Sequence, residues 1–131
     1  MIERINFREF CFRYAFNEHR KKLLRLLVED LDVIKGQCDR LRVLIFGSYI
    51  SFKKNPKDID ILLALIPNRD SVYAIMKSGL RRKHPGTVDV QFNKAQRFMK
   101  DADSLIRNFN ENPLNKRKGI VINDAVELTD F

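Results

Sequence analysis

The sequence contains little cysteine and no long apolar run, and each absence excludes a class of protein. Only Cys11 and Cys38 occur, both in segments with helical patterns, and no Cys-x-x-Cys or histidine spacing indicates a disulfide framework or a metal site. The longest fully apolar run, Ile61 to Ile66, is far shorter than the roughly 20 residues of a membrane-spanning helix. The first eight positions contain three charged residues and not the apolar core of a signal peptide. We therefore expect a cytoplasmic protein without membrane association.

Acidic residues are fewer than basic ones. The chain carries 25 Lys plus Arg against 17 Asp plus Glu, a net charge of +8. Such a balance favours a polyanionic partner such as a nucleotide or RNA, although it also serves solubility. With 131 residues, 44% of them hydrophobic, no internal repeat and no low-complexity segment, residues 1–131 are expected to form a single domain with one ordinary core.

Hydrophobic periodicity predicts an N-terminal helical segment over residues 1–36 and a core over residues 41–92. From about residue 7 to residue 34, apolar side chains recur at helical spacing, as in one long helix or two short ones. Three short apolar or alternating stretches predict strands, and a helical stripe separates the second from the third. The strands are expected at 41–46, 57–65 and 87–92, and the helix at about 70–80.

The residues after the core predict one further helix. Positions 94–110 carry the clearest amphipathic pattern of the chain. Residues 111–131 are expected to form a loop around Pro113, a short strand at 119–122 and a tail. The predicted fold class is α/β, with a small mixed sheet of three to four strands, a long N-terminal helix and all helices packed on one face of the sheet.

Three acids stand on the predicted strands. Side chains of a strand alternate, so Asp58 and Asp60 point to one side, and two carboxylates so close must be paired, solvated or bound to a cation. Asp89 lies in the middle of the third strand, where acids are disfavoured. Neighbouring strands can bring such carboxylates within reach of one or two divalent cations, and oxygen-only ligands suit Mg²⁺ or Mn²⁺.

A glycine and a serine follow the first predicted strand. Gly47 permits close approach of the backbone to a ligand, and Ser48 offers a hydroxyl beside backbone N–H groups that can face a phosphate. Taken singly, this pair is an ordinary turn, and the acid pair is a solvated start of a strand. Their conjunction with Asp89 favours a functional site.

Gly47-Ser48 followed by Asp58-Ile59-Asp60 resembles the G-S-x(n)-D-x-D signature of the nucleotidyltransferase superfamily founded on DNA polymerase beta. The size and the order of elements resemble the minimal nucleotidyltransferases, and the resemblance covers roughly residues 41–92. It implies a palm-like fold and transfer of a nucleoside monophosphate from an NTP to a hydroxyl of RNA, protein or a small molecule, with pyrophosphate as the leaving group.

The same resemblance implies roles for individual residues. Asp58 and Asp60 would bridge two metal ions, and Asp89 would complete the catalytic metal site. Gly47 and Ser48 would bind the terminal phosphates of the nucleotide. The first basic residues after this turn are Lys53 and Lys54, which we assign to triphosphate binding.

The chain is too short to carry a second domain for the base or the acceptor, so an active enzyme would need a second copy or a partner subunit to supply it.

Two further hypotheses stay open beside the enzyme. Alternatively, the protein is a non-catalytic partner with the same fold, such as the toxin or antitoxin half of a toxin-antitoxin pair. In the third hypothesis, aromatic rings and arginines between Phe7 and Arg25 bind nucleic acid, although packing also explains the rings. His19 and His84 lack metal-ligand spacing and are interpreted as surface or packing residues.

Overall fold

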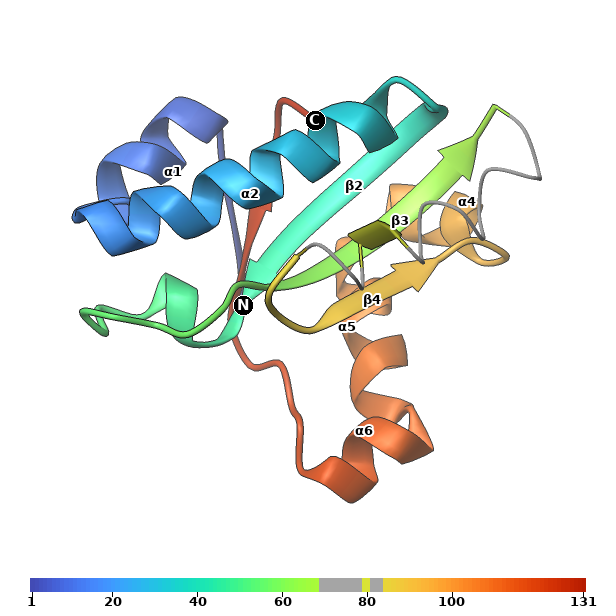
Figure 1. Cartoon of the computed structure of the whole chain (residues 1–131). Helices are drawn as coiled ribbons and strands as arrows, with labels where there is room; N and C mark the ends of the chain where they lie inside the picture. The colour runs from blue at the N-terminus through green and yellow to red at the C-terminus, as the bar shows by residue number, and fades with distance from the viewer. Residues whose placement is uncertain (69–78, 81–83) are drawn as a thin grey trace.

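A computed structural model describes residues 1–68, 79–80 and 84–131 (Figure 1). Its centre is a mixed sheet of five strands in the order β1-β5-β2-β3-β4. β2 is antiparallel to both β3 and β5, whereas β1 pairs with β5, and β3 with β4, in parallel. The α/β class and the mixed sheet are thus confirmed, with more strands than predicted. The strands are β1 (Ile2–Ile5), β2 (Cys38–Phe46), β3 (Asp60–Pro67), β4 (Val88–Gln91) and β5 (Ala125–Leu128).

Helices cover both faces of the sheet, so the prediction of helices on one face is wrong (Figure 1). The reason is that β2 and β3 are apolar on both sides: Val43 and Ile45 are as deeply buried as Leu44 and Phe46. α1 and α2 pack on one face, and α4 and α5 on the other. The helices are α1 (Phe7–Tyr14), α2 (Glu18–Lys35), α4 (Ala95–Lys100), α5 (Ala102–Glu111) and α6 (Pro113–Lys118).

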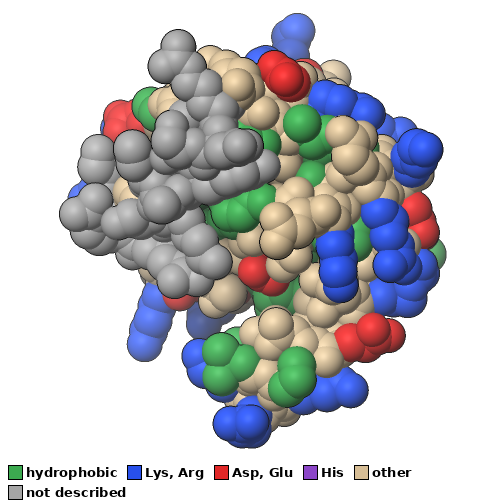
Figure 2. Space-filling model, turned by 90° about the vertical axis from the view of Figure 1, so that its right-hand side faces the viewer, with side chains coloured by type: hydrophobic (Ala, Val, Ile, Leu, Met, Phe, Trp, Pro, Cys, Tyr) green, Lys and Arg blue, Asp and Glu red, His purple; other side chains and the backbone are tan. Residues whose placement is uncertain are grey.

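The predicted helix over 94–110 is interrupted at Asp101. Its carboxylate accepts hydrogen bonds from the Asp103 N–H and the Ser104 hydroxyl, so Asp101 ends α4 and caps α5. Asn112 caps α6 in the same manner, and Pro113 occupies its first turn, where proline is favoured. The loop predicted there is therefore a short basic helix, which forms the lowest part of the molecule in Figures 1 and 2.

Both ends of the chain join the sheet. Residues 119–122, where a strand was predicted, contain none, and β5 forms further along at 125–128, between β1 and β2. β1 was not predicted, because four residues with two charges carry little strand signal. Cys38, predicted in a helix, begins β2. The helix predicted at about 70–80 falls largely on residues outside the described ranges.

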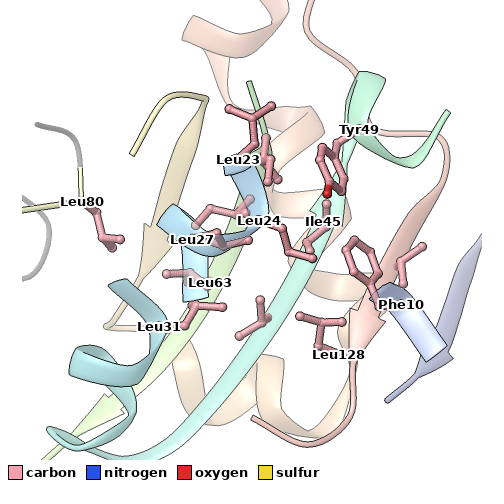
Figure 3. Packing of buried hydrophobic residues seen from close by; sticks show 14 of the residues in the cluster. Phe10, Leu23, Leu24, Leu27, Leu31, Ile45, Tyr49, Leu63, Leu80 and Leu128 are labelled. Carbon is pink, nitrogen blue, oxygen red and sulfur yellow. The ribbon is translucent and has the colours of Figure 1, made fainter. Parts of the chain in front are cut away.

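The N-terminal segment forms two helices instead of one long helix. Asn17 accepts a hydrogen bond from the Arg20 N–H and starts α2, which ends at Lys35, just before the predicted stop at Gly36. One stripe of α2 is fully packed on the sheet: Figure 3 shows Leu24, Leu27 and Leu31 beside Ile45 and Leu63. No helix within the described ranges has the length and apolarity needed to cross a membrane.

Candidate active site at the Gly47 turn

The turn after β2 needs glycine for two reasons. Gly47 begins a 3₁₀ turn, η1 (Gly47–Ile50). Its φ is +77°, a backbone conformation that residues other than glycine rarely adopt. A Cβ atom at this position would also lie 2.4 Å from the Oδ2 atom of Asp60. The sequence suggested that Gly47 makes room for a phosphate. The structure shows that it makes room for the Asp60 carboxylate, so the turn and the acid pair form one unit.

Asp60 and Asp89 share one face of the sheet. Asp60 opens β3 opposite Phe46, and its Oδ1 atom accepts a hydrogen bond of 2.8 Å from the Thr87 N–H. Asp89 lies opposite Leu62, two residues further along β3, and is half-buried like Asp60. Paired residues of neighbouring strands project to the same side, so both carboxylates lie on the face that α4 and α5 cover, about 8 Å apart at the backbone.

Asp58 precedes β3, so the prediction that it lies on the strand with Asp60 is wrong, although it belongs to the same charged cluster. The pKa of its carboxyl is raised, first by partial burial and then by the negative charge of Asp60. The positive charges of Lys53 and Lys57 and the nearby His84 act in the opposite direction. Asp58 and Asp60 therefore lie close enough to repel each other, as their spacing predicted.

The donor set of this cluster fits a magnesium ion in its chemistry. Carboxylate oxygens are the ligands that Mg²⁺ and Mn²⁺ prefer, and Asp58 and Asp60 repel each other until a cation neutralises them. Among the described residues, no group of three or more His, Cys, Asp or Glu side chains is gathered closely enough to hold a metal ion. The structure thus brings Asp58 near Asp60, and Asp60 onto the face of Asp89, without a complete coordination shell.

The residues assigned to the nucleotide lie around the turn. Ser48 is half-buried in η1, and its carbonyl accepts a hydrogen bond from the Ser51 N–H. The side chains of Lys53 and Lys54 are exposed, and Lys53 is near enough to Asp58 to affect its pKa. Beside the turn opens a hollow of about 350 Å³, lined by Phe46, Gly47, Ile50, Ser51 and residues 121–124.

Arg20 holds the loop after this turn, a role that sequence reasoning missed. Its side chain is fully buried, which is rare for an arginine. Its five N–H groups donate to four backbone carbonyls, those of Tyr14, Tyr49, Ser51 and Lys53, of which the last accepts two. Its guanidinium also lies over the Phe16 and Tyr49 rings, 4.3 and 4.8 Å from their centroids.

A signal for this role exists in the sequence. Arg20 stands four residues after Phe16 and four before Leu24, on the apolar stripe of the helix. The contact is reciprocal, because the Tyr49 hydroxyl donates to the Arg20 carbonyl at 2.8 Å. Asn17 adds a bond from its amide to the Lys54 carbonyl. The N-terminus of α2 therefore fixes the backbone of residues 49–54, and with it the loop that carries both lysines.

Several of the aromatic rings and arginines between Phe7 and Arg25, which were predicted to bind nucleic acid, are instead buried or ion-paired. Phe10 and Tyr14 are buried, and the Phe10 ring stacks on Tyr49 with centroids 5.9 Å apart. Arg13 is engaged in ion pairs with Glu3 and Glu9. Phe12 and Phe16 remain exposed.

His84 is a buried neighbour of the acid cluster. Only 4% of its surface is exposed, which confirms the packing alternative of the prediction. Its Nε2 atom lies 2.9 Å from the Ile59 carbonyl, which can only accept, so Nε2 carries the hydrogen. Its Nδ1 atom has no hydrogen-bond partner among the described residues. Burial lowers the pKa of His84, which favours the neutral ring.

The comparisons with known proteins give a family without an assigned activity. Residues 2–123 match the model of a family of unknown function, DUF6932, and the chain belongs to that family. A search of curated proteins and a search of solved structures each found no match.

Proposed function

We propose that the protein is a metal-dependent nucleotidyltransferase, which moves a nucleoside monophosphate from an NTP to a hydroxyl group. The observation that carries this proposal is the close approach of Gly47 to the Asp60 carboxylate, which places the glycine-serine turn against the acid pair. Asp89 lies on the same face of the next strand. An ordinary turn and an ordinary strand start would not need to interlock in this way.

The chemistry requires positioning more than covalent catalysis. The acceptor oxygen attacks the α-phosphorus, a new P–O bond forms, and the bond to the β-phosphate oxygen breaks, so pyrophosphate leaves. Mg²⁺ held by Asp58, Asp60 and Asp89 would lower the pKa of the acceptor hydroxyl and offset the negative charge of the leaving group.

The chain's own residues would orient the nucleotide. The hydroxyl of Ser48 makes no hydrogen bond to a described residue, so it is available to a phosphate oxygen. Lys53 is fixed at its backbone by Arg20 while its ammonium group stays exposed, which suits a contact with the triphosphate. The net charge of +8 favours an RNA acceptor over a neutral small molecule.

The test is label transfer. The purified protein is incubated with each α-labelled NTP, Mg²⁺ or Mn²⁺, and either total RNA or cell lysate. We expect a labelled acceptor with the wild type and none with Asp58→Ala/Asp60→Ala. The matched control, Glu29→Ala/Asp32→Ala, removes two exposed acids of α2 and should transfer label like the wild type.

Two results would contradict the proposal. Absence of both label transfer and metal-dependent NTP binding would leave a non-catalytic partner with this fold as the better explanation. Transfer that survives the double aspartate variant would place the chemistry elsewhere.

A further inference from the structure

A second hollow lies along the N-terminal half of β2, where residues 38–42 line it. Its volume is about 450 Å³, and strands β1, β2 and β5 meet Met99 of α4 there. On β2 the hollow begins at Arg42, five residues and about 16 Å before Gly47, and its lining residue Glu127 lies opposite Leu44. We call it the basic hollow, because four cations and two acids line it: Arg4, Lys35, Arg40, Arg42, Asp39 and Glu127.

Glu127 organises the basic hollow. It lies on β5 with 3% of its surface exposed, and each of its carboxylate oxygens binds one arginine. Its Oε1 atom is 2.7 Å from Nε of Arg4, and its Oε2 atom is 2.7 Å from Nε of Arg42. One buried negative charge therefore holds two guanidinium groups in place, and the three side chains keep a net charge of +1.

The ion pairs use only part of each arginine. Both contacts are made through Nε, and Arg42 makes one further bond, from Nη1 to the Phe98 carbonyl. The terminal nitrogens of Arg4 have no partner among the described residues, and its side chain is 63% exposed. Arg40 is exposed, has no described partner, and lies on the same sheet face as Arg42, two residues away. The hollow thus presents oriented N–H donors and uncompensated positive charge.

We propose that the basic hollow binds the phosphate group of a ligand, with Arg4 and Arg40 as donors and Glu127 as the residue that positions Arg4 and Arg42. A planar guanidinium with its terminal N–H groups free matches the oxygens of a phosphate. The six charged lining residues sum to +2, which attracts an anion and disfavours a cation. This proposal does not depend on the nucleotidyltransferase proposal.

The phosphate could belong to a small phosphorylated molecule or to an RNA strand. Residues 94–118, which follow the hollow through α4, carry seven Lys or Arg against three Asp or Glu. Figure 2 shows basic side chains along the right-hand edge and the bottom of the face that it presents, where α6 lies. An RNA strand could use this charge, whereas a mononucleotide would need only the hollow.

The experiment measures phosphate binding without metal. In EDTA and about 50 mM salt, calorimetry with pyrophosphate and with AMP covers the small ligands, and fluorescence anisotropy with a labelled 12-nucleotide RNA covers the strand. We expect Arg4→Gln/Arg40→Gln to raise the Kd about tenfold or more. The matched control, Lys22→Gln/Arg25→Gln, removes two exposed charges of α2 on the other face and should change Kd less than threefold.

The single variant Arg40→Gln guards against a folding effect, because the exposed Arg40 side chain makes no hydrogen bond or ion pair with a described residue. Its loss of affinity should be smaller than that of the double variant, with unchanged thermal stability. In the RNA arm, the slope of log K against log salt should fall by about one for each phosphate contact removed.

Cys38 lines the hollow and reports where the ligand sits. In a Cys11→Ser background, bound ligand should slow the alkylation of Cys38. Binding in one arm only would support the proposal and identify the source of the phosphate. The proposal is overturned if no arm shows binding at millimolar ligand, if both double variants weaken binding equally, or if Cys38 is not protected.

Discussion

The acid cluster and the basic hollow use buried charge in opposite ways. Behind the acid cluster of Asp58, Asp60 and Asp89, the buried group is a cation, Arg20, which donates four hydrogen bonds to carbonyls of the loop and a fifth to the Tyr14 carbonyl. In the basic hollow, the buried group is an anion, Glu127, held by the full charges of two arginines.

The two buried charges stabilise different parts of the structure. Carbonyl dipoles belong to the backbone, so Arg20 fixes the path of a loop that has no strand of its own between Tyr49 and Lys53. Charged partners belong to side chains, so Glu127 fixes the orientation of two guanidinium groups on strands that the sheet already holds. Loss of Arg20 should therefore cost the fold more than loss of Glu127.

The largest effect is expected from Arg20→Ala. It leaves four carbonyls without their donors and opens a cavity beside Tyr49, so we expect the free energy of unfolding to fall by about 4 kcal/mol. Urea unfolding measures it, with the exposed Arg25→Ala as control. Arg20→Lys, with three donors instead of five, should be intermediate. A loss below about 1 kcal/mol for Arg20→Ala would mean that the loop is held by other contacts.

Glu127→Ala should cost less, about 2 kcal/mol. It leaves Arg42, only 15% exposed, without its counter-charge, whereas Arg4 can turn to solvent. Urea unfolding with exposed Glu111→Ala as the reference gives the difference. If Glu127→Ala lowers the free energy of unfolding as much as Arg20→Ala does, the expected difference between a charge that fixes a loop and one that orients side chains is wrong.

Gly47→Ala tests the close approach of Gly47 to the Asp60 carboxylate. Gly119 provides the control, because it has a similar φ of +71° but open space where a Cβ would be. Both changes to alanine carry the backbone strain, and only that at Gly47 adds the clash with Asp60. We expect Gly47→Ala to lose about 1–2 kcal/mol of stability, with about half of that for Gly119→Ala. Equal losses would show that the carboxylate simply moves aside.

The smallest effect is a pH dependence at His84. Because burial lowers its pKa below the ordinary 6.5, the unfolded chain binds the proton more readily than the folded one. The stability is therefore complete above pH 6.5 and falls as the pH drops through the lowered pKa. Urea unfolding between pH 8 and 5.5 should show a steeper decline in the wild type than in His84→Gln. Lys22→Gln, at an exposed position of α2, should follow the wild type.

Local signals predicted much of the sheet and part of the site. The apolar run 61–66 indicated a central strand because its side chains are buried on both faces. Asp58 and Asp60 were expected near one another because alternation alone brings them to one side. Asp89 was expected on a neighbouring strand, and the parallel pairing of β3 and β4 confirms this. The break at Asp101 and the start of α6 at Asn112 had local capping signals that the periodicity obscured.

Long-range pairing could not be predicted in the same way. β1 and β5 are short and carry charges, and they become strands because they pair with each other and with β2. The apolar stripe indicated that Arg20 is buried, but not its partners in the loop, which lie 29 to 33 residues away. The pairing of Glu127 with two arginines has no local cause, since they lie 85 and 123 residues away.

By itself, the sequence determined that Asp60 and Asp89 stand on strands, because apolar and alternating patterns reflect the backbone period of two, and it determined that a glycine turn precedes them. The tertiary structure alone decided why Gly47 must be glycine, which charged side chains are buried, and that a second, basic hollow exists. Each of these depends on atoms that only the folded chain brings into contact, where removal from water makes every unpaired charge and donor costly.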